Sequence, residues 1–249
     1  MSHLAEAATV IAMMDAQNLW LFGAVTVVFA ALGRAVRGVT SGGALAGAAM
    51  CFALLLGAGR GGFAALLTVF LLTWASTRFG YSRKTRLGTA ESRAGRNALQ
   101  VLANLGVAGA CALLYAFRLP NDEWLIAMCA ALAEASADTT SSEIGQAIGG
   151  APVLITNWRR VAPGTNGALT AVGTAAGIVA SAVVALVCWM MGIVEQRGAI
   201  VCAGAGGAGM LADSVLGATL ERRDLLGNNG VNFVSTGIAA ALAFLLAFH

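Results

Sequence analysis

Residues 124–145 read W-L-I-A-M-C-A-A-L-A-E-A-S-A-D-T-T-S-S-E-I-G, an apolar run that ends in a polar segment rich in hydroxyl groups. Glu134 and Asp138 lie within the apolar run, and Glu143 lies just beyond it. A carboxylate at bilayer depth costs roughly 2.5–3.5 kcal/mol on insertion scales, so such a residue needs a partner and usually marks a functional site. Asp213, near the end of another apolar run, is a fourth acid of this kind.

The whole chain has the composition of an integral membrane protein. Of its 249 residues, 58% are hydrophobic and only 11% are charged, whereas soluble domains have roughly 25% charged residues. The chain has 32 glycines and 3 prolines, as is typical of membrane helices that approach each other through small residues. The 5 cysteines lie in apolar runs without a C-x-x-C pair, which indicates small core residues.

Apolar length predicts an all-α fold with about eight transmembrane helices in one bundle, because a helix needs about 20 residues to cross a bilayer. We expect this domain to cover residues 18–249. Residues 1–17 lack the basic start of a signal peptide, so we expect an N-terminal surface segment there. The second and fifth spans are short enough to be broken or re-entrant. The predicted spans are 18–33, 43–57, 62–78, 97–117, 124–138, 169–191, 199–219 and 231–248.

The basic residues predict the orientation of these spans. Of the 15 lysines and arginines, all but Arg60, Arg118 and Arg197 fall in the loops after the odd-numbered spans. Because basic residues accumulate in cytoplasmic loops, we expect these loops to face the cytoplasm and both termini to lie outside. The chain would then reside in the cell (inner) membrane with its active site on the cytoplasmic side. The predicted cytoplasmic loops are 34–42, 79–96, 139–168 and 220–230.

The spacing of the acids indicates a cation site. Glu134 and Asp138 are four residues apart, so a helix presents both on one face, and Ser142 continues that face. Two carboxylates one turn apart suit Mg²⁺, which takes one or two carboxylates and completes its shell with water and substrate phosphate. The alternative is a polar clamp between helices, in which the acids pair with Arg78 or Arg160.

A weak internal repeat places two of the acids in similar settings. Ala137-Asp138-Thr139 ends one predicted span, and Ala212-Asp213-Ser214 lies in another. Each is followed by a loop and an Asn-Gly turn, at Asn166-Gly167 and Asn229-Gly230. Matches of three residues also arise by chance, but two units of the same orientation would bring Asp138 and Asp213 together at one cytoplasmic mouth.

Basic and glycine-rich loops near these acids indicate phosphate binding. Arginine and lysine are the usual phosphate ligands, although basic loops also follow from topology alone and attract anionic lipid. The turns at 163–167 and 227–230 precede spans, so their N–H groups and the following helix N-terminus suit an anion; Asn-Gly is also a common turn sequence. Neither turn matches the P-loop sequence motif. The candidate nucleotide or phosphate ligands are Arg78, Arg83, Ser142, Arg159, Arg160, Thr165, Asn166, Gly167, Asn228, Asn229 and Asn232. The candidates for substrate contact or support are Gln100, Asn104, Glu134 and Ser214.

The position of the histidines restricts the chemistry. His3 and His249 are the only two, at the ends of the chain, which disfavours a histidine base, a zinc site or haem ligation within the bundle. Phosphoryl transfer onto an existing phosphate tolerates this absence, because a phosphate with a second pKa of about 6 is already largely a dianion at neutral pH.

Seven motifs occur in order from about residue 34 to the C-terminus. They read S-G-G-A-L-A-G (41–47), T-R-F-G-Y-S-R-K (77–84), G-R-N-A-L-Q-V-L-A-N-L-G (95–106), A-S-A-D-T-T-S-S-E-I-G (135–145), P-G-T-N-G (163–167), D-S-V-L-G-A-T (213–219) and N-N-G-V-N-F-V-S-T (228–236). Together they resemble the phytyl-phosphate kinase family of integral membrane proteins. That family phosphorylates phytyl monophosphate to the diphosphate with CTP or a related nucleotide, and it is distantly similar to dolichol kinases and phosphatidate cytidylyltransferases.

The resemblance implies roles for several of the candidates. Asp138, Glu143 and Asp213 would hold Mg²⁺ and the nucleotide, and Lys84 would join them as a catalytic residue that acts, with Arg78, on phosphates. Asn166, Asn228 and Asn229 would line the site.

The expected function is therefore transfer of the γ-phosphoryl group of a nucleotide, CTP by resemblance, to a phytyl, geranylgeranyl, farnesyl or related monophosphate. The alternatives are a CTP-dependent lipid cytidylyltransferase and a transporter for an anionic solute. The expected partners are the isoprenyl monophosphate, the nucleotide and membrane lipid, with a homodimer as an option and no nucleic acid.

Overall fold

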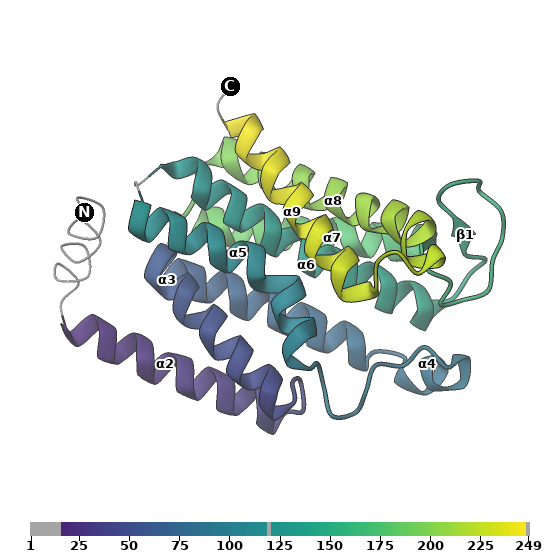
Figure 1. The fold of residues 1–249 in the computed structure, drawn as a ribbon, viewed down its shortest axis with the longest axis horizontal. Helices are drawn as coiled ribbons and strands as arrows, with labels where there is room; N and C mark the ends of the chain where they lie inside the picture. Colours follow the sequence, from purple (N-terminus) through teal and green to yellow (C-terminus); the bar gives the residue numbers. More distant parts are fainter. Residues whose placement is uncertain (1–15, 119–120, 248–249) are drawn as a thin grey trace.

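The computed structural model describes residues 16–118 and 121–247, and this part of the chain is almost entirely helical, as predicted (Figure 1). The predicted surface segment at 1–17 lies, except for its last two residues, outside the described part. The long helices are α2 (Ala16–Ala35), α3 (Ser41–Arg78), α5 (Ala98–Arg118), α6 (Asp122–Ile148), α7 (Ala171–Met190), α8 (Gln196–Thr219) and α9 (Asn228–Ala247). The short elements are α4 (Tyr81–Leu87), the 3-10 turn η1 (Glu221–Arg223) and the antiparallel strand pair β1 (Val153–Leu154) and β2 (Ala168–Leu169).

The structure does not confirm eight membrane crossings, because helix length and composition identify candidate spans and do not count crossings directly. Five described helices are long and apolar enough to span a bilayer. Helix α6 does not qualify because its polar residues lower its mean hydropathy, and the apolar part of α2 is short, at Leu19–Ala35. The five candidate spans are Ser41–Arg78, Ala98–Phe117, Ala171–Met190, Gln196–Arg223 and Asn228–Ala247.

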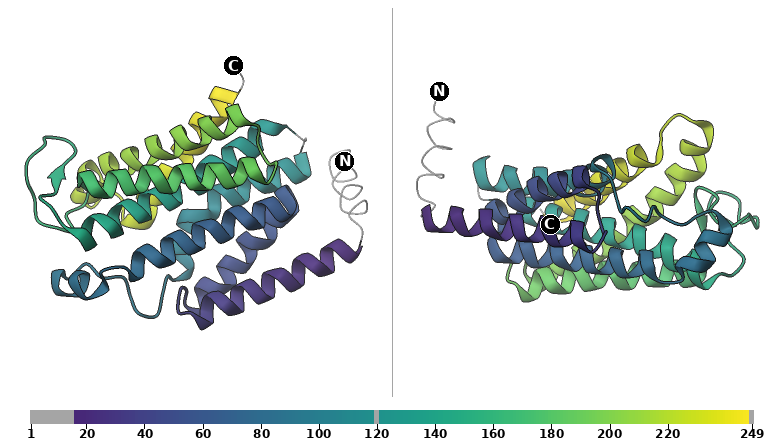
Figure 2. Two further views of the ribbon diagram at one scale, coloured as in Figure 1. Left: turned by 180° about the vertical axis from the view of Figure 1, so that it is seen from behind. Right: turned by 90° about the horizontal axis from the view of Figure 1, so that it is seen from below.

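Helix α3 contains two of the predicted spans, 43–57 and 62–78, and bends sharply between them. The bend is at Gly59, whose φ of 55° and ψ of −140° leave the helical region and suit a residue without a Cβ atom. A Cβ added at Gly62 would lie 2.4 Å from the carbonyl oxygen of Leu54, whereas a straight helix would separate these residues by about 12 Å. The chain therefore folds back on itself inside α3, so that its second half returns toward α4 (Figure 2).

Helix α6 is the centre of the bundle and packs against α3, α5, α7, α8 and α9. Every residue from 127 to 137 is at most 1% exposed, and most are alanines. Glycines on the neighbouring helices allow this close packing: a Cβ at Gly177 of α7 would lie 2.8 Å from the Ala137 carbonyl oxygen. Because protein surrounds this part of α6, Glu134, Asp138 and Glu143 do not face lipid.

The structure corrects one predicted boundary. Residues 139–148 continue α6, whereas the sequence predicted a loop over 139–168. The physical reason is packing against the first turns of α7. A Cβ at Gly173 would lie 2.5 Å from the Ser141 carbonyl oxygen, so the two backbones are in close contact here. Ser141 is buried at this interface, and Thr139 and Thr140 beside it are buried as well.

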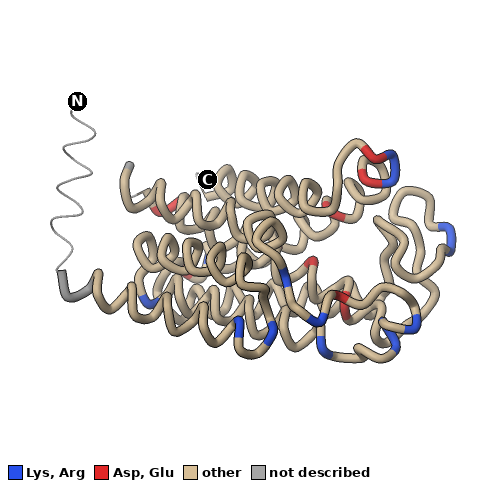
Figure 3. The backbone as a smooth tube through the Cα atoms, turned by 60° about the horizontal axis from the view of Figure 1, so that its bottom comes forward, with Lys and Arg blue, Asp and Glu red and all other residues tan. Residues whose placement is uncertain are grey.

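One end of the bundle collects the polar segments. The loop before α3 pairs with the loop before α5 at Val39 and Arg96, and the turn after α3 packs against the end of α6. The same end, which we call the polar end, carries α4, the β1–β2 pair and η1 (Figure 1). Most lysines and arginines gather there as well (Figure 3). The loops predicted to share one side therefore do share one end of the fold.

Candidate active site

Three adjoining cavities open at the polar end among the described residues. The acid cavity, of about 180 Å³, is lined by Asp138, Asp213 and the turn at 163–167. The middle cavity, of about 290 Å³, also contains Asp138, and the apolar cavity, of about 400 Å³, lies between α2, α3 and α5. The acid and middle cavities share Asp138, Ser142, Gln146 and Asn228. The middle and apolar cavities share Glu91, Arg96, Gln100 and Asn104.

The two aspartates of the internal repeat meet in the acid cavity. Asp138 of α6 and Asp213 of α8 have their carboxyl groups within hydrogen-bonding reach of each other. The hydroxyl of Ser235, on α9, donates to Asp213 Oδ2 at 3.2 Å. Three helices therefore converge on this pair, and the repeat indicated the correct juxtaposition.

The donor set at the aspartate pair is small for a metal held by protein alone. Within residues 16–118 and 121–247, no group of three or more acidic, histidine or cysteine side chains is arranged to hold a metal ion. Mg²⁺ usually takes one or two carboxylates, together with water and substrate phosphates. Asp138 and Asp213 supply such a pair beside a polar cavity, and their charge requires compensation there.

Glu143 is engaged in a buried ion pair with Lys84. The Lys84 side chain is fully buried, and its Nζ also donates to the carbonyl oxygens of Ser76 at 3.0 Å and Thr77 at 2.7 Å. The Thr77 hydroxyl donates to the same carboxylate at 3.2 Å. This ion pair is a polar clamp between helices, but it differs from the predicted alternative, in which Glu134 and Asp138 would pair with Arg78 or Arg160. It ties α4 and the end of α3 to α6.

Glu134 lies one turn deeper than Asp138 and is almost completely buried. Its Oε1 has no hydrogen-bond partner among the described residues. Gly209 of α8 packs directly against it, because a Cβ at that glycine would lie 2.6 Å from Glu134 Cγ. This position, one turn deeper in the bundle, agrees with a role in supporting the aspartate pair.

The turn at 163–167 forms one wall of the acid cavity. Gly164 and Gly167 have φ values of 82° and 76°, in the left-handed region that favours glycine. Gly167 also lies against α8, where a Cβ would come within 2.5 Å of the Ser214 carbonyl oxygen. The turn leads through β2 to Thr170, whose hydroxyl accepts from the Gly173 amide and caps α7.

The structure brings most of the predicted ligands to this end but separates several from the acids. Arg83, Ser142, Thr165, Asn166, Gly167, Ser214 and Asn228 line the acid cavity. Gln100, Asn104, Glu143 and Asn232 line the middle cavity. Arg78 lines the apolar cavity instead, while Arg159, Arg160 and Asn229 line none of the three. Lys84 and Glu134 are not among the lining residues, but Lys84 contacts Glu143, which lines the middle cavity.

Several polar residues at the site were not among the predicted site residues. Glu221 lines the acid cavity, Arg96 and Glu91 lie between the middle and apolar cavities, and Ser235 bonds the aspartate pair. Arg96 lies in the motif at 95–106, which was a usable signal. Its position could not be inferred, because it depends on a contact with α6: an Arg96 guanidinium N–H donates to Thr139 Oγ1 at 3.2 Å.

Comparison with known proteins identifies the family. A model of the family described as integral membrane protein DUF92 matches residues 24–240. The chain belongs to this family. It is 35% identical to the uncharacterized membrane protein sll0875 of Synechocystis sp., over 73% of this chain and 72% of the relative. It is 33% identical to the uncharacterized membrane protein MJ0933 of Methanocaldococcus jannaschii, over 82% and 84%.

A plant relative bears on the resemblance inferred from the seven motifs. The chain is 29% identical to protein VTE6, chloroplastic, of Arabidopsis thaliana, over 76% of this chain and 59% of that protein. VTE6 belongs to the DUF92 family too, and the resemblance to phytyl-phosphate kinases is thereby confirmed at the level of the family. No solved structure matches the chain.

Proposed function

We propose that this DUF92 protein is a membrane kinase that transfers the γ-phosphoryl group of CTP to an isoprenyl monophosphate, such as phytyl, geranylgeranyl or farnesyl phosphate. The observation that carries the proposal is the pair Asp138–Asp213, which lies beside a glycine-rich turn in a cavity that is joined to the apolar cavity through the middle cavity. The family relationship to VTE6 and the resemblance to phytyl-phosphate kinases support the same reaction.

In this proposal the acid cavity receives the nucleotide. Asp138 and Asp213 would hold Mg²⁺, which would neutralise the charge of the nucleotide phosphates. The backbone amides of the turn at 163–167 and the N-termini of α7 and α9 supply partial positive charge to the phosphates. Arg83, which lines the same cavity, adds a full charge.

The acceptor phosphate enters from the opposite side, through the middle cavity. One of its oxygens forms the new bond to the γ-phosphorus, the bond from that phosphorus to the β-phosphate oxygen breaks, and CDP leaves with the electron pair. The acceptor is already a dianion, so no protein base is required. Lys84 and Glu143 act as positioning residues in this scheme, because the ammonium group is fully buried and already has three acceptors.

The same site would serve a cytidylyltransferase, which releases pyrophosphate and leaves CMP on the lipid. A transporter is disfavoured by the arrangement of the described cavities, which open at one end of the bundle. We place that end in the cytoplasm and both termini outside, in the cell membrane, because basic residues accumulate there.

The proposal is tested with protein reconstituted in liposomes, γ-³²P-labelled CTP and geranylgeranyl phosphate. We expect label on the lipid, release of CDP, and loss of transfer in Asp138→Asn. Asp122→Asn is the matched control, since Asp122 is exposed at the other end of the same helix. Release of pyrophosphate with CMP on the lipid would establish the cytidylyltransferase instead. Absence of any product with four nucleoside triphosphates and prenyl phosphates of several lengths would overturn both.

A further inference from the structure

We infer that the apolar cavity is the binding site of the isoprenyl chain, and that Arg96 holds the acceptor phosphate at its mouth. This inference rests on the proposed function and adds to it the location of the lipid substrate. No role is otherwise assigned to α2, to the cavity it covers or to Arg96. The argument follows from the lining of the cavity, its volume and the contacts of its arginines.

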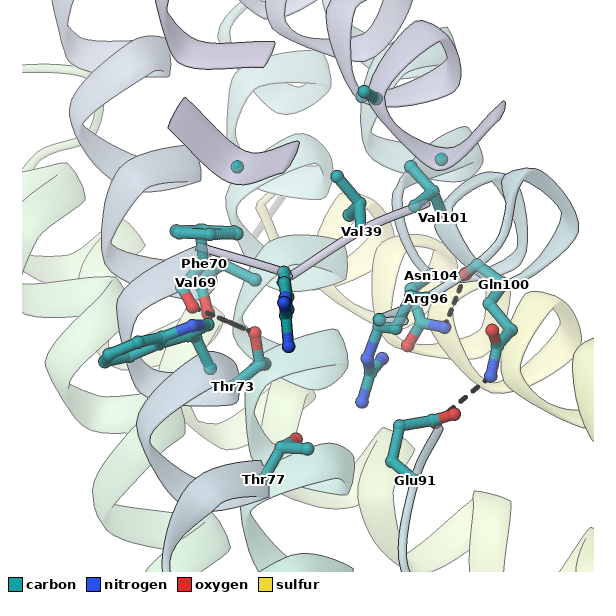
Figure 4. Close-up of a pocket in the computed structure, with 18 of the residues that line it drawn as sticks. Val39, Val69, Phe70, Thr73, Thr77, Glu91, Arg96, Gln100, Val101 and Asn104 are labelled. Atoms are coloured by element: carbon teal, nitrogen blue, oxygen red, sulfur yellow. Dashed lines mark hydrogen bonds between the residues drawn. The ribbon is translucent and has the colours of Figure 1, made fainter. Parts of the chain in front are cut away.

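The walls of the apolar cavity differ from those of its mouth. Phe29 of α2, Leu66, Val69 and Phe70 of α3, and Leu105 of α5 form the inner walls. Figure 4 shows Phe70 and Val69 on one side of this space and Val101 on the other. Helix α2 packs chiefly against α3, and its outer surface exposes large apolar residues such as Trp20 and Val27. Helix α2 therefore lies between the cavity and the bilayer, and we take its side as the entrance for a lipid chain.

The mouth is strongly basic. Arg37, Arg78, Arg93 and Arg96 line it, against a single acid, Glu91. Two of the four, Arg78 and Arg93, are held by groups away from the acids. Arg78 donates to the Val36 carbonyl oxygen and lies over the Trp74 ring, 4.6 Å from its centroid, and Arg93 lies over the Tyr81 ring at 5.4 Å.

Arg96 is the arginine that connects this mouth to the acids. It lines both the apolar and the middle cavity, and it interacts electrostatically with Asp138. Its bond to Thr139 fixes it next to that aspartate. In Figure 4 its side chain extends into the open space beside Glu91, whose carboxylate accepts a hydrogen bond from Gln100 at 3.1 Å. A phosphate held there would lie between the lipid chain and the proposed nucleotide site.

The volume favours a single chain. An engineered cavity of about 150 Å³ holds one benzene ring, so a cavity of about 400 Å³ accommodates on the order of 16 carbon atoms. This is about three isoprene units, with a longer chain extending into the bilayer beside α2. A bilayer phospholipid has two acyl chains, which together exceed the cavity. The occupant to which we commit is a single-chain isoprenyl monophosphate.

The first experiment measures binding without nucleotide, so that it does not depend on transfer. Equilibrium binding of tritiated geranylgeranyl phosphate and of geranylgeraniol is compared in the wild-type protein, Arg96→Gln, Arg96→Lys and Arg86→Gln. Arg86, on α4, is exposed and lines none of the described cavities, so it is the matched control. We expect Arg96→Gln to weaken binding of the phosphate about 10- to 100-fold, as for loss of a charged hydrogen bond. Binding of the alcohol should not change, and Arg96→Lys should recover part of the loss.

Several results would overturn the inference. Equal weakening of phosphate and alcohol would mean that Arg96 is structural, and displacement of the ligand by equimolar phosphatidic acid would mean a phospholipid site. In the kinase assay, the KM for the acceptor should rise in Arg96→Gln while the KM for CTP stays constant; the opposite pattern would assign Arg96 to the nucleotide. If the wild-type protein shows no transfer but binds the lipid phosphate in a way that depends on Arg96, the proposed function is contradicted and the inference about the lipid site stands.

The second experiment shortens the cavity. Gly47 lines it, and a Cβ at this position meets no atom within 4 Å, so Gly47→Phe fills the space without a backbone clash. We expect lower affinity for geranylgeranyl phosphate than in the wild type, with affinity for the ten-carbon geranyl phosphate maintained. Gly23→Phe is the control, because Gly23 also has open space but does not line the cavity. Unchanged chain-length preference in Gly47→Phe would place the lipid elsewhere.

Discussion

The acid cavity and the apolar cavity are built in opposite ways. Around Asp138 and Asp213, helices pack closely through glycine and alanine. A Cβ atom added at most of the buried glycines there would collide with backbone or side chain. Around the apolar cavity, α2 covers the space loosely and Gly47 has room beside it. The difference suits two substrates of different solubility. A nucleotide requires fixed charges at the polar end, whereas a lipid requires an opening toward the bilayer.

The largest expected effect is at the acids. Asp213→Asn removes one of the two carboxyl groups of the aspartate pair and should lower the rate of transfer by about 100- to 1000-fold, as for loss of a group that stabilises developing charge. Binding of geranylgeranyl phosphate should not change, because the apolar cavity is separate. Asp224→Asn is the matched control, since Asp224 is exposed on the same side of the fold. Parallel loss of transfer and lipid binding would show that the two cavities are not independent.

The next effect is at the clamp between α4 and α6. Lys84→Met leaves the Glu143 carboxylate buried without its cation, which should lower the free energy of unfolding by about 3–5 kcal/mol. The double variant Lys84→Met with Glu143→Gln should recover much of this loss. Thermal unfolding in detergent, followed by circular dichroism, measures both. If the double variant regains stability and also full transfer, neither side chain is needed for the chemistry.

A smaller effect is expected where the helices pack most tightly. In Gly209→Ala the new Cβ meets Glu134 Cγ at 2.6 Å and Ala239 Cβ at 2.9 Å, so overpacking should cost about 1–3 kcal/mol. Gly207→Ala, on the same helix with open space around it, should be neutral or stabilising. A comparison of their melting temperatures tests whether the acid region is as tightly packed as the contacts indicate.

The smallest effect is expected at the basic pair Arg159 and Arg160. Both are exposed and line none of the described cavities, although the sequence placed them among the phosphate ligands. The KM for CTP in Arg159→Gln with Arg160→Gln should stay within about twofold of the wild type. A rise of tenfold or more would return this pair to the nucleotide site and imply that the β1–β2 segment closes over it.

The candidate site was partly predictable because some of its signals are local. A carboxylate in an apolar run is costly wherever the helix packs, so Asp138 and Asp213 are conspicuous without a structure. The partner of Glu143 was not predictable, because several cations lie at similar sequence distances and only the position of α4 selects Lys84. Arg96 was overlooked for the same reason: its charge is visible in the sequence, but its place between two cavities is not.

The sequence by itself determined the helical membrane class, the common end for the basic loops and the importance of the buried acids. Each follows from composition, or from the cost of placing one residue in a given solvent. The tertiary structure decided that α6 lies at the centre, that α3 folds back at Gly59 and that an apolar cavity lies beneath α2. These features depend on contacts between helices far apart in the chain, where small differences in packing select one partner among several of equal chemistry.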